Sequence, residues 1–338
     1  MQLIEFIAGI AVLILLHEFG HFIAARLLKV EIEEFGIGFP PRMVTLFERH
    51  GTIFSLNWLP LGGFVRPKGE NDPEIEGGLA AASPWVRLGV LFAGPLTNIL
   101  IGIILGTFLF YSIGDLIQEK VLVDFTAPGS PAETAGLQPG DLFISVNGEA
   151  IDDMSKLQSI IADNMGTSVI AIIERNGERI TLELVPRANP PEGEGPLGVA
   201  LTNPKKPVSM LTAASRGVIV TFENIRGILA LPVRLINGSA SPEEGRLVGY
   251  KGMYDIYTNL QSPLWFFMII SISLGITNLL PIPALDGGRI LLTLPEIIFR
   301  RRVPPRFENA LHLIGFTALI LLLIYINVQD FINPVAIP

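Results

Sequence analysis

Four long stretches of apolar residues alternate with more polar segments along the chain. Each stretch carries few charged residues and is about as long as the ~20 residues that a helix needs to cross a bilayer. The expected spans cover roughly residues 4–25, 88–114, 256–285 and 310–328. The pattern predicts a polytopic α-helical membrane protein of about four transmembrane helices. The first span is expected to be retained, because it lacks the basic leader and the small-residue cleavage site of a signal peptide.

Basic residues gather in two of the segments that separate the spans. Between the first and second spans they are Arg26, Lys29, Arg42, Arg49, Arg66, Lys68 and Arg87. Between the third and fourth spans they are Arg300, Arg301, Arg302 and Arg306, and none follows the fourth span. The positive-inside rule then makes both loops cytoplasmic and leaves both termini and the central region on the other side of the membrane.

Residues 30–66 show the pattern of strands rather than of a helix. Apolar and β-branched runs flank a turn at His50-Gly51, and the prolines at 40, 41 and 60 exclude a continuous helix. We expect a β-hairpin here, with His50 as a solvated turn residue and not a metal ligand. If it enters the membrane, it must be shielded by protein or line a water-filled cavity.

The central region changes character between residues 117 and 202 and predicts a soluble α/β module. Strands are expected at 120–125, 142–146, 169–173 and 180–184, and Asn147-Gly148 and Asn176-Gly177 are typical hairpin turns. A short helix should begin after Ser130, which can cap it, with Pro131 in its first turn.

Residues 208–236 have helical periodicity but carry Arg216, Glu223, Arg226 and Arg234. A fifth span would reverse the last two spans and move the arginine cluster at 300–306 to the wrong side. An amphipathic helix on the outer face fits better, followed by a linker at 239–245. The expected parts are therefore a membrane half at 1–114, a soluble module at 115–203, an amphipathic helix with linker at 204–262, and the last two spans at 263–338.

Composition limits the chemistry that the chain can perform. It has 338 residues, of which 49% are hydrophobic and only 17% charged, and it contains no cysteine. Disulfides and thiolate ligands are thus excluded, so a bound zinc must be held by histidine and carboxylate. The net charge of −8 gives no reason to expect nucleic acid as a partner.

The first span contains His17-Glu18-Phe19-Gly20-His21, an H-E-x-x-H motif. On a helix, His17 and His21 share one face and can hold one metal ion, while Glu18 can act as general base on a water that the metal activates. The alternative is a polar cluster near a helix end or a satisfied buried pair. Ionisable residues at membrane depth are costly, however, and indicate function.

A third ligand is expected at the end of the third span. There the run from Asn278 to Arg289 breaks the helix with two prolines and two glycines, and it places Asp286 at membrane depth. A carboxylate at membrane depth needs a partner, and a zinc ion held by two histidines needs a third ligand. Binding of Asp286 to the zinc ion would satisfy both requirements. The alternative is that Asp286 pairs with Arg289 near the membrane boundary. His312 is expected to be a boundary histidine and not a ligand.

The metal motifs at 17–21 and 278–288, together with the central module, resemble the site-2 protease family of intramembrane zinc metalloproteases, in its bacterial form with one PDZ domain. The run Ser130–Asp141 followed by Val146-Asn147-Gly148 is the part that resembles a bacterial PDZ domain. Such domains bind extended peptide by strand addition. The segment Gly249–Met253 departs from the Gly-Pro pattern that many relatives have before the third span.

The resemblance implies a multi-pass protein of the bacterial cytoplasmic membrane that cleaves single-span membrane proteins, such as anti-sigma factors or signal-peptide remnants, after another protease has trimmed them. It implies one zinc ion on His17, His21 and Asp286, with Glu18 as the base, and it makes 30–66 a membrane re-entrant β-loop. Asn278 corresponds to the family's substrate-contacting asparagine. The further candidates for substrate contact are Asn98, Gly36, Gly38, Gly62 and Gly63, although Asn98 could instead make an interhelical hydrogen bond.

Two other classes of protein share some of these features. One is a non-proteolytic scaffold that presents the PDZ-like module, against which the intact Glu18 argues. The other is a metal-dependent membrane enzyme or transporter for a non-peptide, against which the module and the hairpin argue, because both suit peptides.

Overall fold

The computed structural model describes residues 1–338 except 71, 192, 242–243, 261 and 335–338. Two positions of the expected linker, 242–243, are thus outside the described residues. The chain forms two compact units: Met1–Leu109 with Met210–Pro338, here called the first unit, and Phe110–Ser209, the second unit. The second unit contains the soluble module expected from the sequence at 115–203.

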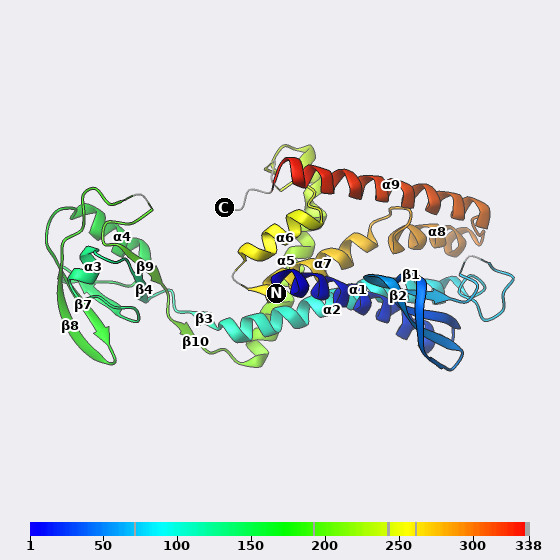
Figure 1. Ribbon diagram of the computed structural model, residues 1–338, viewed down its shortest axis with the longest axis horizontal. Helices are drawn as coiled ribbons and strands as arrows, with labels where there is room; N and C mark the ends of the chain where they lie inside the picture. Colours follow the sequence, from blue (N-terminus) through cyan, green and yellow to red (C-terminus); the bar gives the residue numbers. More distant parts are fainter. Residues whose placement is uncertain (71, 192, 242–243, 261, 335–338) are drawn as a thin grey trace. The chain divides into compact units, whose positions relative to one another are not determined.

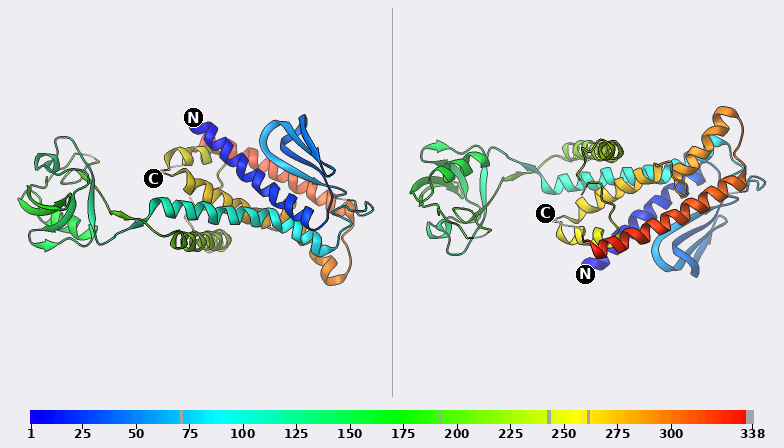
Figure 2. Two further views of the ribbon diagram at one scale, coloured as in Figure 1. Left: turned by 90° about the horizontal axis from the view of Figure 1, so that it is seen from below. Right: turned by 90° about the horizontal axis from the view of Figure 1, so that it is seen from above.

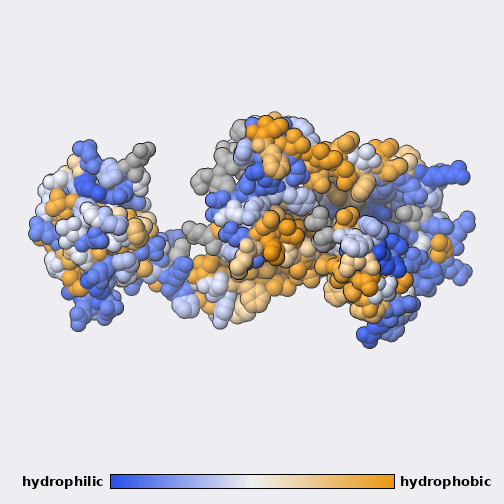
Figure 3. Space-filling view, in the orientation of Figure 1, coloured by the Kyte–Doolittle hydropathy of each residue, from blue (hydrophilic) through white to orange (hydrophobic). Residues whose placement is uncertain are grey.

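Three helices of the first unit are long and apolar enough to cross a membrane: α1 (Gln2–Leu27), α2 (Pro84–Ile113, whose last residues fall in the second unit) and α9 (Pro305–Ile332). They correspond to the first, second and fourth expected spans. Figure 3 shows hydrophobic side chains over much of this unit, whereas the visible face of the second unit is largely hydrophilic. The chain is therefore a helical membrane protein with three candidate membrane-crossing helices among its described residues.

The third expected span is shorter than the stretch at 256–285. Its helix, α7, covers Pro263–Leu279, 17 residues, and the residues before it belong to the separate helix α6 (Tyr250–Asn259). Pro263 suits the first turn of a helix, which explains where α7 begins, and Pro281 explains where it ends. Apolarity alone does not reveal such breaks, so the expected boundaries were too wide.

Close contacts of glycines bring α1, α2 and α7 together. A Cβ atom at Gly20 of α1 would lie 2.6 Å from the carbonyl oxygen of Ala93 in α2, and one at Gly275 of α7 would lie 2.8 Å from that of Pro95. Small residues allow helices in a membrane to approach in this way. The H-E-x-x-H motif lies on α1, so these contacts place α2 and α7 close to it.

The expected hairpin at 30–66 forms, but it is a larger sheet than predicted. Strands β1 (Ile32–Arg49) and β2 (Thr52–Pro67) pair antiparallel around His50 and Gly51, both with positive φ. Both strands bend, so that residues 32–37 pair with 53–56 on one side and with 63–67 on the other. Residues 42–49 pair with 52–57, which gives four rows in the order 42–49, 52–57, 32–37 and 63–67. The row at 63–67, here called the edge row, is the one that lies beside α1.

Helix α5 (Met210–Ile236) is the expected amphipathic helix. It runs across α2 and α7 rather than alongside them (Figures 1 and 2). Its buried residues Ala213, Gly217 and Thr221 recur every four positions, and Gly217 packs on the backbone of α2 at Thr107. The first unit is completed by α8 (Asp286–Phe299), which follows α7 after a short loop.

The second unit contains a six-stranded antiparallel sheet in the order β8-β7-β5-β4-β9, with β6 paired to β5. Its strands are β4 (Val121–Thr126), β5 (Leu142–Val146), β6 (Glu149–Ala150), β7 (Val169–Arg175), β8 (Glu178–Leu184) and β9 (Val199–Thr202). The four expected strands are β4, β5, β7 and β8. The short strands β3 (Asp115–Leu116) and β10 (Lys205–Lys206) pair separately.

Two helices pack with this sheet. Helix α3 (Pro131–Thr134) begins as expected, with the Ser130 hydroxyl accepting a hydrogen bond from the Glu133 amide at 3.2 Å. Helix α4 (Met154–Asp163), whose Asp153 caps it, was not predicted, and neither was β9. The core between the sheet and the helices is apolar, with Phe143 and Leu157 fully buried.

Candidate metal centre

The H-E-x-x-H motif lies within α1, and its two histidines point to the same place. His17 and His21 are buried, with 6% and 9% of their surface exposed, and their Nε2 atoms are 3.2 Å apart. Asp286 stands in the first turn of α8 and brings its Oδ2 atom to 3.2 Å from His17 Nε2 and 3.3 Å from His21 Nε2. Residues 269 positions apart in sequence thus converge on one point.

The spacing of these three atoms matches what a zinc ion requires. Ligands bound at about 2.0–2.1 Å with tetrahedral angles lie about 3.3–3.4 Å from one another. Two imidazole nitrogens and one carboxylate oxygen also form a three-ligand set of the kind found in catalytic zinc sites, which leaves one position open. Among the described residues this is the one group of histidine and carboxylate side chains whose geometry could hold a metal.

Helix α2 orients both histidines through their other ring nitrogen. The Nδ1 of His21 donates to the carbonyl oxygen of Val90 at 2.7 Å, which leaves Nε2 with its lone pair free. Such contacts fix the tautomer of a metal-binding histidine. This role of Val90 could not be predicted from the sequence, because a backbone carbonyl can come from any residue.

Asn98 serves His17 in the same way. Its side-chain amide lies 3.2 Å from His17 Nδ1, it is fully buried, and its Oδ1 atom has no hydrogen-bond partner. Amide oxygen and nitrogen exchange places by a simple flip. In the flipped orientation Oδ1 accepts from Nδ1–H, and His17 Nε2 is then free to bind a metal. Asn98 is also tied to α7, because Ser271 Oγ donates to its backbone carbonyl at 2.8 Å.

A loop between α7 and α8 delivers Asp286 to this point. Ala284 in the loop has φ +80°, and its amide donates to Nδ1 of His312 in α9 at 3.0 Å. His312 thus has a contact with this loop that was not predicted from the sequence. Arg289, one turn into α8, forms its salt bridge with Glu70.

Glu18 lies next to the histidines and faces the edge row. Its Oε2 accepts a hydrogen bond from the Val65 amide at 3.1 Å. Glu18, the three candidate ligands, Gly63 and Asn278 line one cleft of about 450 Å³, to which Arg289 and Glu70 also contribute. Of the residues predicted from the sequence, these six therefore line the same cleft.

The other candidates for substrate contact lie elsewhere. Asn98 is buried behind His17, and Gly36 and Gly38 pack inside the sheet, where added Cβ atoms would meet Phe64 and the backbone of Leu59. Gly62 borders a neighbouring groove that is described below.

Comparison with known proteins gives relatives over almost the whole chain. Residues 5–322 match the model of peptidase family M50. A predicted zinc metalloprotease of Campylobacter jejuni is 35% identical, with 97% of this chain and 93% of the relative aligned. A predicted zinc metalloprotease of Nostoc sp. is 31% identical, with 98% of this chain and 96% of the relative aligned. One of Clostridium perfringens is 29% identical, with 99% of this chain and 100% of the relative aligned.

Among solved structures, the PDZ domain of the SdrC-like protein of Listeria monocytogenes aligns with 26% of this chain and 92% of its own, at 19% identity and a TM-score of 0.23. The family model and the Campylobacter relative each span nearly all of this chain. The chain therefore belongs to peptidase family M50, the site-2 protease family of zinc-dependent metalloproteases.

Proposed function

We propose that this protein is an intramembrane zinc endopeptidase that cleaves single-span membrane proteins within or near their transmembrane segments. The observation that carries the proposal is the convergence of His17, His21 and Asp286 beside Glu18, on a helix long and apolar enough to cross a membrane. A catalytic cluster at that depth has membrane-embedded peptide within its reach.

The chain's own residues divide the chemistry between them. His17, His21 and Asp286 would hold the zinc ion, which when bound supplies Lewis-acid chemistry. Glu18 accepts the proton of the attacking water and later delivers it to the nitrogen of the leaving amide. Asn98 acts as a positioning residue, since it holds His17 from a site outside the cleft.

The edge row would hold the substrate in extended form. Because the Val65 amide points at Glu18, the backbone groups of Val65 and, two residues away, Gly63 face the cleft rather than residues 32–37. A transmembrane substrate hides its carbonyls in helical hydrogen bonds and must unwind before attack. Strand addition at Gly63 and at the Val65 carbonyl replaces some of the bonds that unwinding breaks, while the Val65 amide stays bonded to Glu18.

The second unit would recognise or exclude substrates as a PDZ-like domain. Strand β9 is at an edge of its sheet, and a groove of about 230 Å³ lies between β9 and α4. An extended peptide fits such a groove. With the orientation given by the basic residues, this unit and both termini are extracytoplasmic, and the protein acts in regulated intramembrane proteolysis in the cytoplasmic membrane of a bacterium.

Replacement of the base tests the proposal. In Glu18→Gln the side chain keeps its shape but cannot accept a proton, so we expect zinc to remain bound while cleavage of a model single-span peptide falls by at least ~10²-fold. Glu5→Gln makes the same change on the same helix, away from the cleft, and should leave the rate unchanged. Zinc content by atomic absorption and cleavage by gel provide the measurements.

Near-normal cleavage by Glu18→Gln would remove Glu18 from the mechanism. A wild-type chain that binds zinc but leaves every single-span peptide intact would instead favour the scaffold or the non-peptide enzyme.

A further inference from the structure

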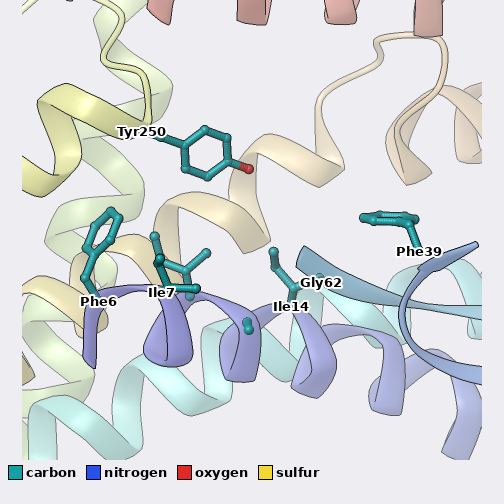
Figure 4. A pocket seen from close by; sticks show the side chains of 8 residues that line it. Phe6, Ile7, Ile14, Phe39, Gly62 and Tyr250 are labelled. Carbon is teal, nitrogen blue, oxygen red and sulfur yellow. The ribbon is translucent and has the colours of Figure 1, made fainter. Parts of the chain in front are cut away.

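A shallow apolar groove of about 80 Å³ runs along α1 toward its N-terminal end. Ile7, Ile10, Ala11 and Ile14 form one wall, and Phe39 of β1 and Tyr250 of α6 lie across from them (Figure 4). The Tyr250 hydroxyl is the one polar side-chain group in this lining, and no charged residue contributes. A groove of this size can accept a row of side chains from a neighbouring segment, but it is too small to enclose a whole ligand.

This groove is continuous with the cleft of the metal centre. Ile14 and Phe39 line both, and Gly62 in the groove is followed by Gly63 in the cleft. A Cβ atom at Gly62 would lie 3.3 Å from Ile14 and 3.1 Å from Phe39, so the absence of a side chain keeps the junction open. A chain segment that reaches Glu18 along α1 therefore passes over Ile14.

The two cavities offer different backbone partners. In the cleft, the backbone groups of Gly63 and Val65 in the edge row face away from residues 32–37, and the Val65 amide is bonded to Glu18. The groove is walled mainly by α1, whose backbone groups there are bonded within the helix, and the Tyr250 amide at the start of α6 donates to Asn327. In a membrane every backbone group needs a partner, so a segment in the groove must satisfy its own.

We propose that the groove holds the part of the substrate's transmembrane segment that is still helical, while the adjoining residues are extended over the cleft. This inference rests on the proposed function. Small residues let membrane helices approach closely, and Ala11 lies at the middle of the groove wall, with Ile7 and Ile14 on either side. The apolar wall accepts the side chains of such a helix without burying a charge.

Cysteine cross-linking can measure the conformation of the segment, because the chain has no cysteine of its own. Ile7→Cys and Ile14→Cys are made in the Glu18→Gln chain. Each is oxidised with a series of model single-span peptides that carry one cysteine at successive positions of a Leu/Ala segment. Ile7 and Ile14 are about 10 Å apart along α1. For a helical substrate the two strongest cross-link positions should differ by about seven residues, and for an extended one by about three.

Val12→Cys is the matched control. Val12 lies between the two test positions, is 51% exposed and does not line the groove. It should cross-link weakly and without a preferred position. Three outcomes would each overturn the proposal. The first is cross-linking from Val12 as strong as from the test positions, and the second is a difference of three residues between the strongest cross-link positions of Ile7 and Ile14. The third is no cross-link from Ile7, as when lipid fills the groove.

A bulky side chain gives an independent readout. Ala11→Trp should fill the groove and lower cleavage of the peptide on the order of tenfold, with zinc content unchanged, whereas Val12→Trp should not. Unchanged cleavage by Ala11→Trp would count against the groove. Because the unmodified chain is tested on the same peptide, failure of the groove is distinguished from failure of the proposed protease activity.

Discussion

At the scale of single residues, we expect the candidate metal centre to depend on residues that do not line the cleft, and Asn98 is the clearest case. Its contact with His17 Nδ1 fixes which ring nitrogen is free. Partners of this kind are worth 10–100-fold in metal affinity, so Asn98→Ala should weaken zinc binding on the order of tenfold or more, as measured by competition with a chelator. Asn98→Asp should restore much of the affinity, because a carboxylate can also accept the Nδ1 proton.

Thr97→Ala is a suitable control, since the hydroxyl of the neighbouring Thr97 donates within α2, to the Ala93 carbonyl, and not to His17. If Asn98→Ala and Thr97→Ala bound zinc equally well, Asn98 would be a packing residue.

Sequence spacing was enough to predict His17, Glu18 and His21, because the helical period places them together. Asp286 followed from the cost of a carboxylate at membrane depth. The role of Asn98 was not predictable in the same way. An asparagine in an apolar helix indicates a hydrogen bond, but its partner depends on how α1 and α2 pack.

At the level of elements, the loop that carries Asp286 is held by another helix. His312→Ala would leave the partly buried Ala284 amide without its acceptor, at a cost of about 1 kcal/mol. We expect both a lower melting temperature and less bound zinc, since the loop positions a candidate ligand. His312→Asn should recover both, because its Oδ1 occupies nearly the place of Nδ1.

Thr317→Ala, on the same helix, should change neither quantity, because the Thr317 hydroxyl donates within α9, to the Leu313 carbonyl. A loss of melting temperature without a loss of zinc in His312→Ala would mean that the contact supports α9 but not the ligand.

Elements with a strong local pattern were predicted well. The strand at 142–146 and the turns at Asn147-Gly148 and Asn176-Gly177 appear as expected, because their propensities agree with the fold. The bends that turn the hairpin at 30–66 into four rows, and the break between α6 and α7, were not predicted. Both depend on packing within the first unit, which leaves little trace in hydropathy.

At the scale of the whole molecule, we propose that catalysis and substrate selection belong to different units. Every described residue that lines the cleft belongs to the first unit. We therefore expect the second unit to act as a filter against substrates with bulky outer domains. Deleting residues 117–202, with a flexible linker in their place, should leave cleavage of a short-ended transmembrane peptide largely intact and raise that of an untrimmed substrate.

The competing view is that this unit docks substrate by strand addition beside β9. Deletion would then slow the cleavage of both substrates. A point variant separates the two views without removing the unit: Ala162→Trp fills the groove between α4 and β9. Docking predicts that this variant also slows both reactions, whereas a filter, which needs only the bulk of the unit, predicts wild-type rates for both. A parallel loss in the deletion and in Ala162→Trp would therefore refute the filter.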